Sequence, residues 1–211
     1  MSSKHQLVYA HDPMCSWCWG FNKSYAQLLN TLPESIEVTR LLGGLAKDSS
    51  EPMPIEMQNY LQQTWKTIEK TIPGTRFNHN FWTDCQPRRS TWAACRAVIA
   101  ARRQGVEFDE AMTITIQQGY YLESRNPSDD STLIEFAAGI GLDSTLFEAE
   151  LDLDATHRQL DQEMALCRDL GVRGFPALVF LVAESAWPVK IDYNNAEEML
   201  TEIKSLMQKN P

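Results

Sequence analysis

The sequence has few cysteines, few basic residues and no long apolar run, and each shortage excludes a class of protein. Five cysteines among 211 residues are too few for a scaffold held together by disulfide bonds, and the odd number leaves at least one thiol unpaired. No apolar run approaches the roughly 18 residues that a membrane-spanning helix needs. The formal net charge of −9 disfavours nucleic acid and anionic membranes as partners, because phosphate binding needs clustered Lys and Arg.

The first residues, MSSKHQLVYAHDP, become polar again after a short apolar run. They lack both the apolar core and the small-residue cleavage site of a secretory signal. With 43% hydrophobic and 22% charged residues, the chain has the balance of a globular protein of one or two domains. We therefore expect a soluble cytoplasmic protein, whose oligomeric state the sequence leaves open.

The basic residues that do cluster are arginines in the middle of the chain. They recur at helical spacing, at Arg88, Arg89, Arg96, Arg102 and Arg103. This spacing is typical of the solvated face of a helix, which is our prediction for them. The same group could instead receive an acidic ligand.

Residues 5–11 and 35–45 have the patterns of two strands, with a helix between them. HQLVYAH is short, apolar and ended by Asp-Pro, whereas SIEVTRLLGGL alternates and ends in Gly-Gly. Between them, apolar residues recur every three or four positions from Phe21 to Leu29, until Pro33 closes the pattern. The order is β-α-β, and a CxxC pair stands at the N-terminus of the helix.

From residue 47 to about 170 the pattern is helical throughout. Asn-Pro-Ser-Asp-Asp at 126–130 is a helix start with acidic residues in its first turn, and glycines stand where helices should stop. We predict helices at 54–71, 88–104, 108–122, 130–139, 143–150 and 156–170.

The chain ends in a β-β-α pattern. VRGFPALVFLVA is a strongly apolar strand, AWPVKIDY is a second strand that Pro188 keeps at the sheet edge, and Asn194-Asn195 caps a helix that runs to about residue 208. The whole chain therefore describes an α/β protein with a thioredoxin-like fold and a large all-helical insertion. We place the thioredoxin-like domain at 1–46 plus 171–211 and the insertion at 47–170, packed on the sheet because both junctions are short.

The pair Cys15 and Cys18 could serve a metal site, a structural bridge or a redox reaction. A metal site needs a second pair of soft ligands, but Cys85, Cys95 and Cys167 form no second CxxC and the histidines show no ligand spacing. A bridge at this spacing closes too small a loop to stabilise the fold much. We therefore favour redox chemistry and expect no metal.

Redox exchange needs a thiolate, and a helix N-terminus favours one through its free N–H groups and the positive end of its dipole. Cys15 stands at that position, so it is the predicted nucleophile. Cys18, one turn further on, should be more buried and should attack the mixed disulfide that Cys15 forms with a substrate. Ser16-Trp17 between them holds neither His nor Pro.

Several segments together resemble the DsbA-like branch of the thioredoxin superfamily, and in particular its FrnE-type members, which lack a signal peptide. They are DPMCSWCWGF, LLGGL, RRSTWAACRAVIAAR, YYLESRNPSDDSTL and LGVRGFPALVF, so that the resemblance covers essentially the whole chain. It implies a thiol-disulfide oxidoreductase or isomerase that acts through Cys15-Ser16-Trp17-Cys18 on peptide, protein or low-molecular-weight disulfides. No tightly bound cofactor is implied, and glutathione is a possible redox partner.

In that family the late proline is cis and lies against the cysteine pair, which carries over to Pro176. A cis bond there would turn the backbone of Phe175 outward to pair with an extended substrate. The other interpretation, an ordinary trans proline at the start of a strand, stays open. Aromatic and apolar residues beside the cysteines are candidates for a substrate platform rather than core: Met14, Trp17, Trp19 and Phe175.

Four other residues have two interpretations each. His11 could tune Cys15, although a histidine hydrogen-bonded within its strand is the favoured reading. Cys95 and Cys167 fall on apolar helix faces and should be small buried residues, while Cys85, in the polar loop WTDCQPRR, is the one cysteine with a possible second redox role.

Two other functions stay open. The same inserted-helix architecture serves glutathione-dependent transferases and isomerases of the kappa and hydroxychromene-carboxylate type, which have a serine where Cys15 stands here. A non-catalytic binding module that merely retains its CxxC is the third possibility. The presence of both cysteines favours dithiol-disulfide exchange on a thiol or disulfide peptide or protein.

Overall fold

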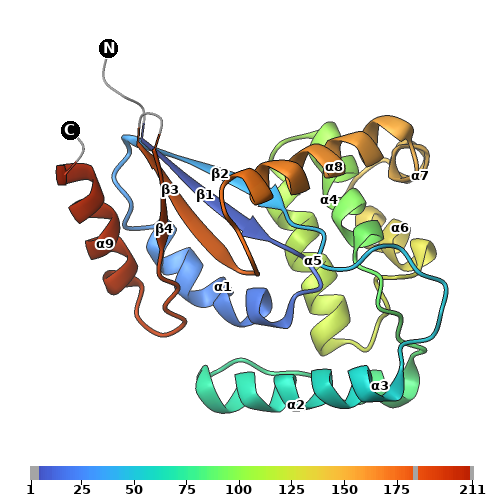
Figure 1. The fold of residues 1–211 in the computed structure, drawn as a ribbon. Coiled ribbons are helices and arrows are strands. Elements are labelled where there is room, and N and C mark those ends of the chain that lie inside the picture. The colour runs from blue at the N-terminus through green and yellow to red at the C-terminus, as the bar shows by residue number, and fades with distance from the viewer. Residues whose placement is uncertain (1–4, 183–184, 210–211) are drawn as a thin grey trace.

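A computed structural model describes residues 5–182 and 185–209 (Figure 1). Its one sheet has four strands in the order β2-β1-β3-β4. The first two strands run parallel, as a β-α-β unit requires, and the other neighbours are antiparallel. The strands are β1 (His5–His11), β2 (Ile36–Leu42), β3 (Ala177–Val182) and β4 (Ser185–Val189).

Helices cover both faces of the sheet, and the side chains of β1 alternate between them. Leu7 and Tyr9 pack in a core with α1 (Ser16–Leu29) and α9 (Ala196–Lys209). Val8 and Ala10 pack on the other face with Cys167, near the end of α8 (Asp154–Asp169). The period of two is that of a strand with both faces covered, and the predicted α/β fold with a helical insertion is confirmed.

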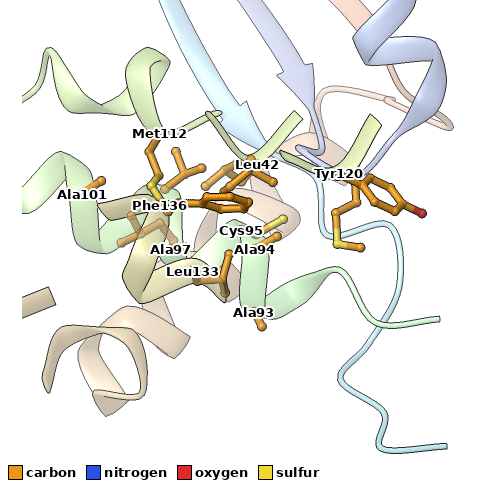
Figure 2. Close-up of a cluster of buried hydrophobic side chains, with 14 of the residues drawn as sticks. Leu42, Ala93, Ala94, Cys95, Ala97, Ala101, Met112, Tyr120, Leu133 and Phe136 are labelled. Carbon is orange, nitrogen blue, oxygen red and sulfur yellow. The ribbon is translucent and has the colours of Figure 1, made fainter. Parts of the chain in front are cut away.

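Most of the remaining helices gather at one end of the sheet, while the helix of residues Ile55–Thr71 runs alongside α1 (Figure 1). Their core surrounds α4 (Trp92–Gln104), whose alanines are all buried and let neighbouring helices approach closely. Figure 2 shows Ala97 near Phe136, with Leu42 of β2 in the same cluster. The helices are α2 (Ile55–Thr71), α3 (Phe81–Asp84), α4 (Trp92–Gln104), α5 (Phe108–Leu122), α6 (Asp130–Gly139) and α7 (Ser144–Leu151). In the described part of the chain, every helix is too short or too polar to cross a membrane.

Element boundaries differ from the predictions in several places. The short helix α3 was not predicted, because its residues 81–84 lie in a polar segment. Helix α4 begins at 92 rather than 88, since Arg88 instead forms an isolated bridge with Pro52. Strand β3 begins only after Pro176, and the last residue of that predicted strand, Ala183, lies outside the described residues.

The last strand and helix follow the sequence more closely. Strand β4 ends at Val189 rather than Tyr193, because the Asp192 carboxylate accepts the backbone N–H groups of Asn194 and Asn195 in a turn. Asn195 then accepts the N–H of Glu197 and caps α9, as predicted.

The predicted solvated face was wrong for most of the arginine cluster: Arg103 is exposed, but Arg96 is buried and Arg102 is largely buried. Arg102 donates to Asp109 at 2.6 Å and to Glu163 at 2.7 Å, in a network that is largely buried. Glu163 also accepts the backbone N–H of Leu42 at 2.8 Å, and Asp109 also accepts from Arg40. Helical spacing shows which face the charges share, but not that α5, α8 and β2 cover it.

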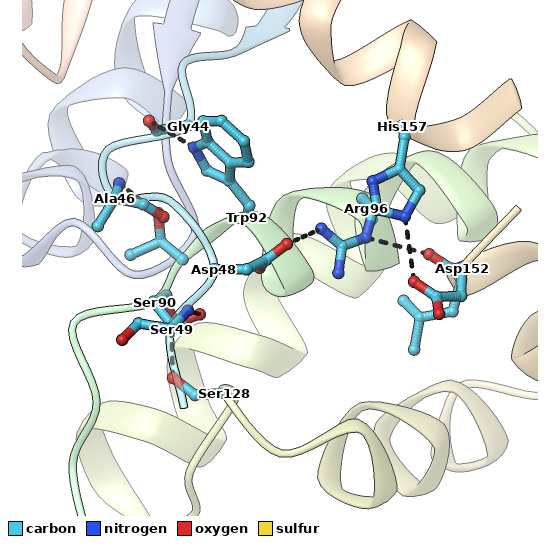
Figure 3. Close-up of polar contacts among 12 residues, drawn as sticks. Gly44, Ala46, Asp48, Ser49, Ser90, Trp92, Arg96, Ser128, Asp152 and His157 are labelled. Carbon is cyan, nitrogen blue, oxygen red and sulfur yellow. Dashed lines mark hydrogen bonds and ion pairs between the residues drawn. The ribbon is translucent and has the colours of Figure 1, made fainter. Parts of the chain in front are cut away.

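The chain that leaves β2 is tied to α4 by further polar contacts (Figure 3). The indole of Trp92 donates to the carbonyl oxygen of Gly44 at 3.0 Å, and the buried Arg96 donates to Asp48 at 2.6 Å. Such contacts hold the insertion against the sheet at the first junction. The division into domains 1–46 plus 171–211 and 47–170 stays a prediction.

Candidate active site

The cysteine pair stands where β1 gives way to α1. Cys15 is the N-cap of α1, with an extended backbone, and its N–H donates to the carbonyl oxygen of Asp12 at 3.0 Å. The first turn of α1 carries no acidic residue. Cys15 is 6% exposed and Cys18, one turn further on, is 0% exposed, so the predicted difference in burial is confirmed. Both are free thiols.

The two thiols have different electrostatic surroundings. Burial raises the pKa of the Cys18 thiol well above its ordinary value, and its hydrogen bond with Cys15 and the charge of that residue raise it further. Cys18 therefore stays protonated near neutral pH. The Cys15 thiol also donates to the carbonyl oxygen of Phe175 at 3.4 Å.

The loop before β3 lies against this pair. The Phe175–Pro176 peptide bond is cis. The ring of Phe175 lies so close to Gly43 that a Cβ added there would be 1.9 Å from its Cζ. This packing therefore requires a glycine at position 43. Through Phe175, the loop before β3 contacts both the LLGGL segment and Cys15.

Asp12 is a site residue that the sequence analysis treated only as the end of a strand. Its carboxylate is fully buried and accepts the backbone N–H groups of Met14 at 2.8 Å and Leu45 at 2.7 Å. It also accepts the Thr91 hydroxyl at 2.7 Å and the Cys95 thiol at 3.5 Å. Burial raises the pKa of the Asp12 carboxyl, while these hydrogen bonds oppose the rise. Asp12 thus connects the loop that carries Cys15 to the segment after β2 and to the start of α4.

Trp65 of α2 is the second residue that sequence reasoning missed. It is fully buried, and its indole donates to the hydroxyl of Ser16 at 2.9 Å. The tryptophan stacks on Phe77 with ring centroids 4.8 Å apart. Helix α2 of the insertion therefore contacts Ser16, the residue directly after Cys15. The two residues are 49 positions apart in the sequence, so no local pattern reveals the contact.

A cavity of about 170 Å³ opens beside Cys15. Of the predicted substrate platform it includes Met14, Trp17 and Phe175. Trp19 lies outside it, because its indole donates to the carbonyl oxygen of Arg76 at 3.1 Å. Pro176 is buried and does not line it. The full lining is Met14, Cys15, Ser16, Trp17, Leu45, Met53, Tyr60, Leu61, Thr64, Arg88, Arg89, Thr91, Tyr120 and Phe175.

His11 is buried in β1 and stacks on Tyr9, with ring centroids 4.9 Å apart. Within the described residues neither ring nitrogen has a hydrogen-bond partner, so the prediction of a hydrogen-bonded strand histidine was wrong. Burial lowers the pKa of His11 well below its ordinary value, and the charges of Arg40 and Arg102 lower it further. The ring is therefore neutral at physiological pH, and its predicted tuning of Cys15 stays a prediction.

The other cysteines are separate from the pair. Cys95 and Cys167 are buried in helices, as predicted, and burial raises the pKa of both thiols. Cys85 is half-buried directly after α3 and donates to the carbonyl oxygen of Ser124 at 2.9 Å. No group of three or more His, Cys, Asp or Glu residues in 5–182 and 185–209 is arranged to hold a metal ion.

The chain is similar in sequence to known proteins. The family model described as thioredoxin matches residues 9–202. Among curated proteins, the ClpXP adapter protein SpxH of Bacillus subtilis (strain 168) is 22% identical, over 95% of this chain and 73% of its own length.

Solved structures share the fold at low sequence identity. A candidate protein disulfide isomerase from Nitrosomonas europaea superposes with a TM-score of 0.84 at 22% identity, covering 99% of this chain and 100% of that one. The cytosolic disulfide reductase DsbM from Pseudomonas aeruginosa has a TM-score of 0.76 at 20% identity, covering 97% and 99%. The same reductase solved with GSH has a TM-score of 0.73 at 19% identity, covering 96% and 99%. At these identities the likeness concerns the fold alone.

Proposed function

Because the chain belongs to the thioredoxin family, with the helical insertion of its DsbA-like branch, we propose that it is a thiol-disulfide oxidoreductase that works through Cys15 and Cys18. The observation that carries the proposal is the difference between the two thiols. Cys15 lines a cavity at the N-terminus of α1, while Cys18 is buried directly behind it. A nucleophile that reaches substrate and a resolving thiol that does not are the two parts that disulfide exchange needs.

The proposed reaction has two steps. The Cys15 thiolate attacks one sulfur of a substrate disulfide, so that a mixed disulfide forms and the first substrate thiol leaves with a proton. Cys18 then gives up its proton and attacks the Cys15 sulfur, which releases the second substrate thiol and forms the Cys15–Cys18 disulfide. The substrate gains two electrons and two protons, and two molecules of a thiol such as glutathione return the enzyme to its reduced form as they become a disulfide.

Three further parts of the proposal go beyond the general reaction. The substrates are peptide, protein or low-molecular-weight disulfides, and isomerisation follows when Cys15 exchanges within one substrate before Cys18 acts. Phe175 and Trp17 line the route to Cys15, with Pro176 supporting the loop. The setting is the cytoplasm, where a reducing thiol pool would favour reduction; DsbM, described as cytosolic, is a fold neighbour.

Glutathione conjugation is the competing reaction. A transferase needs one polar group to activate glutathione and gains nothing from a second thiol, whereas a second thiol one helical turn from Cys15 supports disulfide exchange. A binding module would need neither thiol. The relative SpxH is described as an adapter protein, and an adapter is an example of such a non-catalytic binding module.

An insulin reduction assay beside a glutathione conjugation assay tests the proposal. Cys18→Ser should abolish turnover and let Cys15 accumulate mixed disulfides, because attack can begin but not finish. Cys15→Ser should prevent the adduct as well. Cys85→Ser is the matched control and should reduce insulin like the wild type, since that thiol lies outside the cavity. Full activity in Cys18→Ser, or conjugation alone in the wild type, would contradict the proposal.

A further inference from the structure

The cavity beside Cys15 contains two arginines and no acidic residue. Arg88 has its own counter-charge, because it donates to Asp129 at 2.6 Å and to the carbonyl oxygen of Ser128. Arg89 is half-buried, and in 5–182 and 185–209 it has neither an ion pair nor a hydrogen-bond partner. Its guanidinium is therefore a positive charge at the cavity that the described residues leave uncompensated.

Tyr120 brings a hydroxyl to the same cavity. Its ring is 4% exposed and belongs to the buried cluster of the helical block, but Figure 2 shows its hydroxyl directed away from that cluster. Burial raises the pKa of Tyr120, and the charge of Arg89 acts in the opposite direction, which places the two groups within electrostatic range of each other. The phenol stays protonated at neutral pH and can donate a hydrogen bond.

Three other hydroxyls of the lining are engaged elsewhere, and the Thr64 hydroxyl is one of them, since it donates to the carbonyl oxygen of Tyr60 at 2.9 Å. The phenol of Tyr60 itself belongs to a side chain that is 65% exposed. The Thr91 hydroxyl donates to Asp12, and the Ser16 hydroxyl accepts from Trp65. Most of the remaining lining is apolar, including Met53 and Leu61. A ligand that fits this cavity is small and largely apolar, with one anionic group.

We propose that Arg89 and Tyr120 form a carboxylate-binding subsite, so that the preferred substrates are small disulfides carrying a carboxylate on the thiol that becomes bonded to Cys15. This inference rests on the proposed disulfide exchange. A carboxylate would meet the guanidinium in a partly enclosed site, where charges interact more strongly than in water. The net charge of −9 repels anions in general, so that a local cation is what makes such a substrate acceptable.

A panel of three small disulfides tests the charge preference: dithiodipropionate is anionic, hydroxyethyl disulfide is neutral and cystamine is cationic. In Arg89→Gln we expect kcat/KM for dithiodipropionate to fall about 10-fold, which corresponds to about 1.4 kcal/mol. The value for hydroxyethyl disulfide should stay within about twofold, and that for cystamine should not fall. Arg89→Lys should recover part of the loss, and Tyr120→Phe should lower dithiodipropionate turnover about threefold.

Arg158→Gln is the matched control, because Arg158 is exposed on α8, outside the cavity, and its replacement removes the same charge. It should leave all three disulfides unaffected. An equal loss for all three disulfides in Arg89→Gln would mean a structural role and would overturn the proposal. So would the same loss in Arg158→Gln, which would mean a long-range effect of net charge.

A second measurement separates this inference from the proposed function, because it needs only a reactive Cys15. Iodoacetate and iodoacetamide alkylate the same sulfur, and they differ mainly in the charge of the first. Peptide mass spectrometry gives the rate of alkylation of Cys15 by each reagent. The rate with iodoacetate divided by the rate with iodoacetamide should fall about 10-fold in Arg89→Gln. An unchanged ratio overturns the subsite. The wild type could show the Arg89-dependent preference for iodoacetate and yet reduce none of the disulfides. That result would refute the exchange reaction and still support the anion-binding subsite.

Discussion

Replacement of Asp12 by Ala should destabilise the protein strongly, because its carboxylate accepts hydrogen bonds from separate segments at the active site. Two of the donors are backbone N–H groups: that of Met14 would lose its acceptor in a buried position, and that of Leu45 in a partly buried one. At about 1–3 kcal/mol for each unsatisfied group, the loss is roughly 2–6 kcal/mol. The cost of burying the carboxyl group, which raises its pKa, disappears in the variant and offsets part of that loss. We therefore expect a net loss of about 2–4 kcal/mol in the free energy of unfolding.

Urea unfolding at pH 7, followed by tryptophan fluorescence, measures this difference. Asp12→Asn keeps the size of the side chain and one acceptor oxygen, and should lose about 1–2 kcal/mol, because its amide faces one of the N–H donors. Asp152→Ala is the matched control, since that carboxylate is 86% exposed and pairs only with His157 at the surface; its effect should stay within about 0.5 kcal/mol. If Asp12→Ala were no less stable than Asp152→Ala, the structural role assigned to Asp12 would be refuted.

Two further predictions concern buried charge. Arg102→Met should lower the free energy of unfolding by about 3–5 kcal/mol, because Glu163 loses a buried counter-charge and Asp109 keeps that of Arg40 but loses that of Arg102; a loss below about 1 kcal/mol in urea unfolding would restore the prediction of a solvated face. His11→Phe should change the pH dependence of stability. Burial lowers the pKa of His11, so below the unfolded pKa of about 6.5 the unfolded state binds an extra proton, and stability is lost as the pH falls by up to about 1.36 kcal/mol per unit. His11→Phe removes that contribution, so its stability relative to wild type should improve between pH 6.5 and 5; a difference that stays constant over this range contradicts the assignment.

Local patterns were enough for the sheet and for the cysteine pair. The apolar runs in residues 5–11 and in β3, and the alternation in residues 35–45, each reflect contacts that neighbouring residues of one strand make, so a short window carries the information. The place of Cys15 at a helix N-terminus follows from the same reasoning, since the strand ends at Asp-Pro and the helical period begins just beyond it.

Long-range contacts account for what the sequence did not reveal. Asp12 looked like an ordinary turn residue, because its partners Leu45 and Thr91 come from other elements. Trp65 looked like one apolar position of an amphipathic helix, although it holds Ser16. Arg102 shared its helical spacing with solvent-exposed charges, and only the packing of α4 against its neighbours buries it. In each case the missing information is which surface another element covers.

The reduction potential of the Cys15–Cys18 couple tests the account most directly. The protein is equilibrated with mixtures of reduced and oxidised glutathione, quenched by acid, alkylated and analysed by mass spectrometry. We expect a single transition between two free thiols and an intramolecular disulfide joining Cys15 to Cys18, and in Cys18→Ser a glutathione adduct on Cys15 instead. If the two thiols stayed reduced across the whole range of mixtures, or if Cys18 rather than Cys15 took up the glutathione, the proposed exchange reaction would be wrong.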